Sequence, residues 1–286
     1  MEGSRIKTIV IIILALLNGF LLVLSGGRRL EDARSQERAR TDAIEVIHSN
    51  GISLEEEIVP KQMELRPMQA ARDPVRESAF ASELLGTEVT GEHRGGEVYR
   101  YANASGSVQF HSTGEVLVQF EPGLYPLDGE DAAEHAAAVA ELLDCRTQAL
   151  ESSVENGTGT VVLVQTLEDV SVLDCRLTAH YVDGDLLRLQ GVRLPGRSVT
   201  LEAGSPISAA TALIRLYNGL KEMGDIYSEI ESIQWAYSME LERSGTVHLI
   251  PVWKVRTDTG DYLLDTMTGR LSRAAGFGGL AEQSEE

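Results

Sequence analysis

A long apolar run near the N-terminus constrains this chain more than any other feature. Residues Ile6 to Leu24 read IKTIVIIILALLNGFLLVL. A membrane-spanning helix needs about 20 mostly apolar residues, whereas the apolar core of a cleaved signal peptide has about 7 to 15. The length favours a retained anchor, with cleavage after Ser25 as the alternative. We therefore expect a domain that is tethered to a membrane by one N-terminal helix.

Two features of the sequence predict opposite orientations for this anchor. Arg5 and Lys7 precede the span, whereas five arginines lie between Arg28 and Arg40. Counted alone, these charges would keep the C-terminal side in the cytoplasm. A short tail before a long apolar core is instead typical of an uncleaved signal anchor, which exports the domain on its C-terminal side. We expect a single-pass cell-membrane protein with an extracytoplasmic C-terminal domain.

The remaining sequence is acidic and long enough for real hydrophobic cores. About 260 residues lie beyond the anchor, enough for one large domain or two small ones. The formal net charge is −19. Nucleic acid and anionic membrane surfaces both bind clustered Lys and Arg, so this charge argues against them as partners. The acidity is explained more simply as a means of keeping an exported domain soluble.

Capping residues, glycine turns and hydrophobic periodicity predict an α+β fold with two helix-plus-antiparallel-sheet modules. The charged segment from Arg28 to Arg40 is expected to form a solvated helical stalk. The predicted helices are residues 42–49, 74–85, 130–145 and 205–223, and the predicted strands are residues 98–102, 107–111, 115–120, 160–167, 170–182, 185–193, 230–241, 247–257, 262–265 and 270–273.

We divide the chain into a tail and anchor (1–26), a stalk with a first module (27–127), a second module (128–273) and a disordered tail (274–286). The segments Tyr99–Leu117 and Trp253–Leu271 share an aromatic start and then two glycines at similar spacing. This similarity favours duplication of a domain, and the alternative is that any three-strand meander has such a pattern.

The two cysteines, Cys145 and Cys175, have no C-x-x-C spacing and no histidine at ligand distance along the chain. This argues against a zinc site. A disulfide between them would add about 3 kcal/mol if the geometry allowed it. Two buried free thiols are the alternative.

Catalytic and metal-binding patterns are weak. The six histidines are scattered, and no G-x-S-x-G elbow occurs. The acidic turns Asp128–Asp131 and Asp183–Asp185 lack the rest of a calcium loop. We predict no catalytic residue, no cofactor and no metal, with a hydrolase whose site the sequence hides as a third hypothesis.

The anchor itself carries the best candidate site. Ala15 and Gly19 are four residues apart, a small-xxx-small spacing that lets a second helix approach closely. Asn18 lies on the same face and can donate an interhelical hydrogen bond, and an unpaired asparagine in a span is costly. Ala15, Asn18 and Gly19 are therefore predicted to form a face for a partner helix. The alternative is that small residues are simply common in spans.

Two segments resemble a known family. The opening SRIKTIVIIILALLNGFLL has a short basic tail, Lys7-Thr8 at the start of the span and Leu17-Asn18 near its middle. It resembles the opening of YycI-type regulatory proteins. The final hairpin, from Trp253 to Gly269, resembles the last unit of that family and, more broadly, a PepSY-like module.

The resemblance implies a membrane-anchored, extracytoplasmic accessory regulator of a WalK-like sensor histidine kinase of the cell envelope. The expected partners are that kinase and a YycH-like sister protein, contacted partly through transmembrane helices, and no catalytic residues are implied. The runner-up is a PepSY-like inhibitor or chaperone of an extracytoplasmic peptidase. The acidity and the arginine-rich stalk depart from the family and leave the identity of the kinase open.

Overall fold

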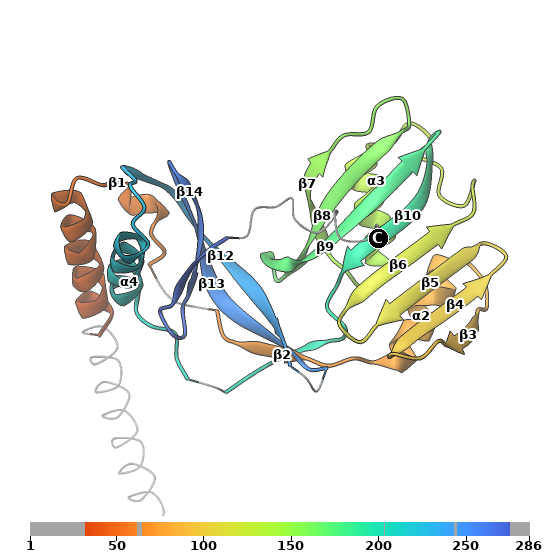
Figure 1. Cartoon of the computed structure of the whole chain (residues 1–286), viewed down its shortest axis with the longest axis horizontal. Helices are drawn as coiled ribbons and strands as arrows, with labels where there is room; N and C mark the ends of the chain where they lie inside the picture. Colours follow the sequence, from red (N-terminus) through yellow and green to blue (C-terminus); the bar gives the residue numbers. More distant parts are fainter. Residues whose placement is uncertain (1–31, 62–64, 203, 243–244, 275–286) are drawn as a thin grey trace, which may run out of the picture.

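The chain folds into two lobes, and the strands of both lobes belong to one large sheet. The computed structural model describes residues 32–61, 65–202, 204–242 and 245–274. Residues 74–192 form one lobe, here called the inserted lobe, and the described residues before and after it form the base lobe (Figure 1). The base lobe contains a helix over residues 32–49, here called the N-terminal helix, together with β1 (Ser53–Leu54), η1 (Glu56–Ile58), β2 (Met68–Ala70), β11 (Ser198–Thr200), α4 (Ala209–Glu222), β12 (Glu229–Leu241), β13 (Val247–Thr257), β14 (Gly260–Asp265) and β15 (Leu271–Arg273).

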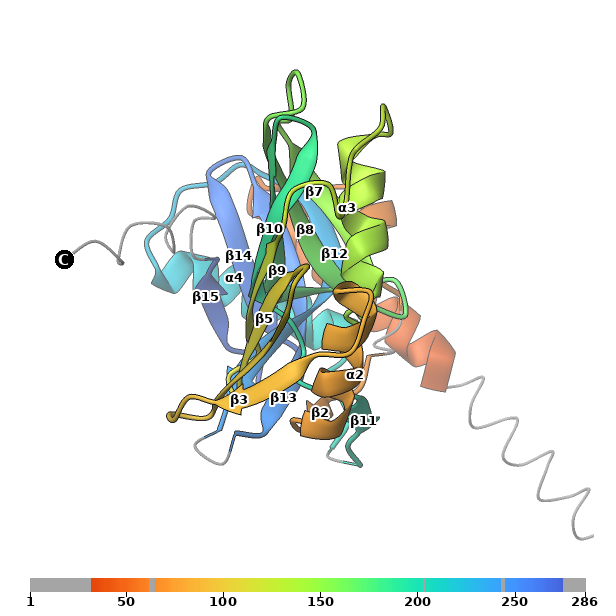
Figure 2. The same ribbon diagram turned by 90° about the vertical axis from the view of Figure 1, so that its right-hand side faces the viewer.

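The inserted lobe has two helices on one face of an antiparallel sheet (Figure 2). Its hydrophobic core lies between the helices and the sheet, with Leu84, Phe110, Val139 and Leu189 among the buried side chains. Its elements are α2 (Pro74–Leu84), β3 (Thr90–His93), β4 (Val98–Asn103), β5 (Gly106–His111), β6 (Glu115–Phe120), α3 (Ala132–Glu141), β7 (Thr147–Ser152), β8 (Gly159–Leu167), β9 (Val170–Val182) and β10 (Asp185–Val192).

The sheet joins the lobes through one short parallel contact. Its main strand order is β11-β2-β13-β12-β9-β10-β6-β5-β4-β3. Neighbours along this order are antiparallel except β9 and β12, where Ser171 pairs with Ala236 and Val172 pairs with Tyr237. A small hydrophobic cluster that includes Val172 and Tyr237 packs at this junction. The fold is therefore a mixture of helices with a large, mainly antiparallel sheet, as the α+β prediction required.

The base lobe has its own core between two helices and the sheet. The N-terminal helix contributes Ile44 and Ile47, α4 contributes Leu216, and β13 contributes Trp253, all of them buried. Residues far apart in the sequence are thus packed into one core. Because the inserted lobe lies between β2 and β11 in the sequence, the base lobe is completed only after the inserted lobe has been traversed.

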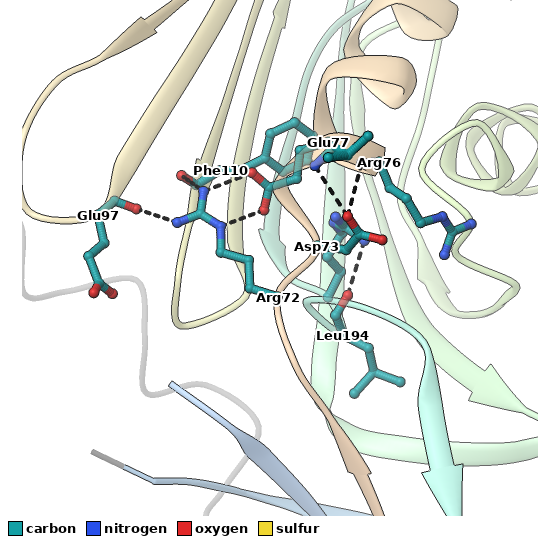
Figure 3. A network of polar contacts seen from close by, with 9 residues as sticks. Arg72, Asp73, Arg76, Glu77, Glu97, Phe110 and Leu194 are labelled. Carbon is teal, nitrogen blue, oxygen red and sulfur yellow. Dashed lines mark hydrogen bonds and ion pairs between the residues drawn. The ribbon is translucent and has the colours of Figure 1, made fainter. Parts of the chain in front are cut away.

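Two adjacent linkers connect the lobes. A Cβ on Gly196 would lie 2.0 Å from the carbonyl oxygen of Ala71, so the outgoing and incoming chains are in direct contact there. On the incoming linker, Arg72 donates to Glu77 from Nε at 2.7 Å and from Nη2 at 2.8 Å (Figure 3). Arg193, on the outgoing linker, is buried and donates to the carbonyl of Leu194 at 3.0 Å. Arg193 Nη1 also donates to the carbonyl of Leu143, in the inserted lobe, at 3.4 Å. The partly buried Arg72 and the buried Arg193 therefore hold both linkers against the inserted lobe.

Several predicted boundaries are confirmed by local hydrogen bonding. Asp73 caps α2 by accepting from the backbone N–H of Val75 at 3.2 Å, and Pro74 occupies the first helical position. The hairpin between β9 and β10 turns at Asp183 and Gly184, whose φ angles of 53° and 88° match the Asp-Gly signal.

Other boundaries were wrong. The helix predicted to reach Cys145 ends at Glu141, because the chain turns through Asp144, where φ is 58°, before β7 begins. The helix predicted from residue 205 begins at Ala209, since Ile207 donates its N–H to Thr266 instead. Strands β1, β2, β3, β7 and β11 were not predicted.

The boundary between modules at residues 127 and 128 stays a prediction. Buried residues on both sides of it, from Ala81 to Leu189, belong to the core of the inserted lobe. The two similar segments both form antiparallel meanders, β4-β5-β6 and β13-β14-β15. Their origin by duplication also stays a prediction, and residues 275–286 lie outside the described residues.

Candidate functional site: a groove beside the N-terminal helix

The partner face predicted within the span lies outside the described residues. Ala15, Asn18 and Gly19 all precede residue 32, where the description begins, as does the rest of Ile6–Leu24. Within the described ranges, no helix combines the length and apolar character that crossing a membrane requires. The role of these three residues therefore stays a prediction.

The N-terminal helix is fixed to the base lobe by a buried arginine. Arg40 is 1% exposed, and its Nη2 donates to Glu56 Oε1 at 2.6 Å and to Glu37 Oε1 at 2.7 Å. Its Nη1 also donates to the carbonyl oxygen of Glu56 at 3.2 Å. The expectation of a solvated stalk is thus wrong at Arg40, although residues 32–39 are exposed. The helix is clamped onto η1 rather than standing free.

Helix α4 begins at a serine cap and buries one face. Ser208 Oγ accepts from the backbone N–H of Thr211 at 3.3 Å. Leu213, Leu216 and Leu220 recur at helical spacing and are fully buried. The helix also approaches β15 closely, because a Cβ on Gly219 would lie 2.8 Å from Leu271 Cδ2. This packing leaves the other side of α4 facing outward.

A groove of about 830 Å³ runs between the N-terminal helix, α4 and the turn that leads into β15. Its apolar part includes two of the exposed large hydrophobic side chains of the protein, Val46 at 42% and Met223 at 36% exposure. Its lining residues are Ala39, Asp42, Ala43, Val46, Ala210, Thr211, Ile214, Arg215, Asn218, Gly219, Glu222, Met223, Gly269, Arg270 and Leu271.

Charged side chains of both signs line the groove. Arg215 and Arg270 come from adjacent parts of the lining, because a Cβ on Gly269, the residue before Arg270, would lie 3.1 Å from Arg215 Cγ. Glu222 is seven residues beyond Arg215 on α4, which places it about 10 Å along the helix axis. Asp42 lines the groove from the N-terminal helix. None of these four side chains has a hydrogen-bond or ion-pair partner among the described residues.

The arrangement is suited to binding. An apolar centre with a charged, solvated rim is the anatomy of protein interfaces, and its volume lies within the range of natural binding pockets. Sequence reasoning missed this groove. The signal was a second stripe on α4, with Ala210, Ile214 and Asn218 at four-residue intervals outside its buried face.

The two cysteines are free and buried. Burial raises the pKa of Cys145 to about 11, and it also raises the pKa of Cys175. Because the thiolate is the reactive form and both side chains are fully buried, we expect neither thiol to react in the folded protein. The structure therefore favours two buried free thiols over a disulfide.

One of the histidines and one of the acidic turns make structural hydrogen bonds. His135 Nδ1 lies 2.7 Å from Tyr181 Oη within the core of the inserted lobe. Asp131 caps α3 by accepting from the N–H of Ala133 at 2.9 Å. Over the ranges that the structure describes, no group of three or more His, Cys, Asp or Glu side chains is placed to hold a metal ion.

Comparisons with known proteins give only distant likenesses. No protein-family model matches the chain, and no curated protein matches it in sequence. An uncharacterized protein from Eubacterium rectale ATCC 33656 is 14% identical over 74% of this chain and 86% of its own, with a TM-score of 0.47. The Bacillus megaterium YpeB C-terminal domain is a distant structural neighbour, 12% identical over 72% of this chain and 99% of its own, with a TM-score of 0.35. Likenesses of this size fix neither a family nor an activity.

Proposed function

We propose that this chain is a membrane-tethered, non-enzymatic regulator that binds a sensor histidine kinase of the cell envelope. A single-span sister protein would join the complex, as in YycI-type systems. The groove beside the N-terminal helix carries this proposal. It is an apolar, charge-rimmed groove along the first described helix, whose first described residue, at position 32, is only a few residues after the predicted anchor.

The position of the groove links the two parts of the hypothesis. A partner that spans the same membrane would meet the anchor face of Ala15, Asn18 and Gly19 first, and would then pass the groove. Because Arg40 clamps the N-terminal helix to the base lobe, a change in the position of the anchor would be passed to the folded domain. Such coupling is what a regulator acting through transmembrane contacts requires.

The proposal is tested by photo-crosslinking from position 19 in native membranes, with the captured proteins identified by mass spectrometry. A sensor kinase or a single-span sister protein in the adduct supports the proposed function. Lipid adducts alone would remove the transmembrane contact from it. A captured peptidase would instead favour the PepSY-like inhibitor as the function.

The matched control places the same photo-crosslinker at position 21, about 160° around a helix from position 19. Protein adducts at position 19 that are absent at position 21 identify a face-specific contact. Equal adducts at both positions would indicate unspecific proximity and contradict a defined partner face.

A further inference from the structure

We propose that the groove binds a juxtamembrane α-helix of a second membrane protein, one that carries an acidic and a basic side chain two turns apart beside an apolar stripe. This inference rests on the proposed function and names the chemistry of its partner. It concerns described residues of the base lobe and is independent of the predicted face within the span.

The shape of the groove fits a helix. Two helices form its long walls, with Ala39, Ala43 and Val46 on one side and Ala210 and Ile214 on the other. Small side chains in these walls let a third helix lie close, since the distance between packed helices depends on the side chains at the contact. Val46 and Met223 supply exposed apolar surface that a partner would cover. An apolar helix face seated in such a groove is a recurrent mode of recognition.

The charges of the groove define the polar pattern of the partner. Arg215 and Arg270 both line the groove, and a guanidinium group there would pair with a carboxylate of the partner. Glu222, two turns along α4, would pair with a Lys or Arg at the matching spacing on the partner helix. These charges have no partner among the described residues, so they are available for a partner's charges. Such rim pairs contribute selectivity and association rate more than raw affinity.

The chain length between the predicted span and the groove favours a partner from the same membrane. Seven residues, 25–31, lie between Leu24 and the first described residue of the N-terminal helix, and a chain of seven residues covers at most about 25 Å. Ala39 lies about 10 Å further along that helix. A helix that continues from a neighbouring span can extend this far from the membrane and reach the groove without further folded structure.

The test uses the full-length chain in lipid nanodiscs and three labelled helical peptides with the same Ala/Leu stripe. One peptide carries Glu and Lys seven residues apart, one carries Glu at both positions, and one carries Lys at both. Fluorescence anisotropy should show the mixed peptide binding tightest to the natural chain. In the double variant Arg215→Glu, Arg270→Glu, the groove becomes wholly acidic. The mixed peptide should then lose about fivefold in affinity, and the Lys peptide should bind tightest.

Lys221→Glu is the matched control, because Lys221 is exposed on the same helix and does not line the groove. This variant should leave the ranking of the peptides unchanged. Val46→Trp should weaken all three peptides by filling the groove. Absence of binding by every peptide, or an unchanged ranking in the double variant, would overturn the inference. A kinase captured from position 19 alongside such a result would leave the proposed function standing.

Discussion

The guanidinium group of Arg40 lies against η1, with Nη2 only 2.6 Å from Glu56 Oε1, although the sequence around it is strongly charged. The backbone carbonyl of the same Glu56 accepts a second bond, from Nη1 at 3.2 Å. One residue thus joins the N-terminal helix to the segment after β1. This joint holds one wall of the groove, the N-terminal helix, against the base lobe.

Arg40→Ala should destabilise the base lobe by about 2 kcal/mol, because it removes a buried aliphatic stem together with charge-assisted hydrogen bonds. Both tryptophans, Trp235 and Trp253, lie on strands of the base lobe, so urea unfolding monitored by tryptophan fluorescence reports on this lobe. Arg38→Ala, at an exposed position two residues away on the same helix, should cost less than about 0.5 kcal/mol. Equal costs for both variants would show that the clamp contributes nothing.

The ion pair of Arg72 and Glu77 should contribute more to the stability of the inserted lobe than a solvent-exposed ion pair does. Glu77 is almost completely buried, and both of its oxygens accept from Arg72. Glu77→Ala leaves a largely buried guanidinium without its carboxylate, which should cost about 3–5 kcal/mol. Circular dichroism during urea unfolding measures the loss.

Asp144→Asn provides the comparison for this pair, because asparagine tolerates the left-handed backbone at this position, where φ is 58°. It removes the charge that Asp144 contributes to the contact with Arg76, at 2.6 Å, which is more exposed to solvent. The cost should stay below about 1 kcal/mol. A loss of similar size for Glu77→Ala would mean that burial gives the Arg72 pair no special weight.

His180 should make the protein less stable in mild acid. Its Nε2 is buried without a hydrogen-bond partner among the described residues, and burial, together with the smaller effect of the nearby charge of Arg188, lowers its pKa from 6.5. The unfolded state therefore binds this proton more readily than the folded state, and stability falls as the pH drops below 6.5.

Urea unfolding at several pH values checks this effect. Between about pH 7.5 and about pH 5.5, His180→Gln should lose less stability than the natural chain. His48→Gln is a control at an exposed histidine in the base lobe. Identical pH profiles for the natural chain and His180→Gln would contradict the role of His180.

Much of the fold could be predicted because local signals and burial agree. Asp73-Pro74 caps a helix, Asp183-Gly184 turns a hairpin, and the long strands β9, β12 and β13 carry dense apolar patterns. The missed strands are short or largely exposed. Thr90–His93, for example, is exposed at every residue and has no alternating pattern to detect.

The insertion and the groove could not be predicted, because both depend on contacts between distant segments. Nothing local in the sequence of α4 shows that residues 32–49 would pack beside it. Arg40 shows the same limit. It falls on one stripe with the buried Ile44 and Ile47, yet its charge predicts exposure. Its burial depends on the carboxylates of Glu37 and Glu56, and Glu56 is 16 residues away in the sequence.

The two cysteines should be unreactive in the folded state and reactive after unfolding. Cys145 and Cys175 are fully buried, and their pKa values are raised by burial. Labelling with a thiol reagent at about pH 8 should modify neither in the native protein and both in denaturant without reductant. Failure to label the denatured, unreduced protein would show a disulfide and contradict the structure at this point.

The predicted face within the span is tested by substitution at Gly19. A small-xxx-small interface brings two helix backbones close together, so the side chain of Gly19→Ile would separate them. Helix contacts of this kind contribute about 1–2 kcal/mol, and association with the captured partner should weaken about tenfold. Energy transfer between labelled proteins in reconstituted membranes measures this association.

The control is Leu21→Ile, which changes the shape of a side chain on another side of the span and should have little effect on association. The tryptophan fluorescence of both variants should match that of the natural chain. Unchanged association for Gly19→Ile would leave the groove as the surface that recognises the partner.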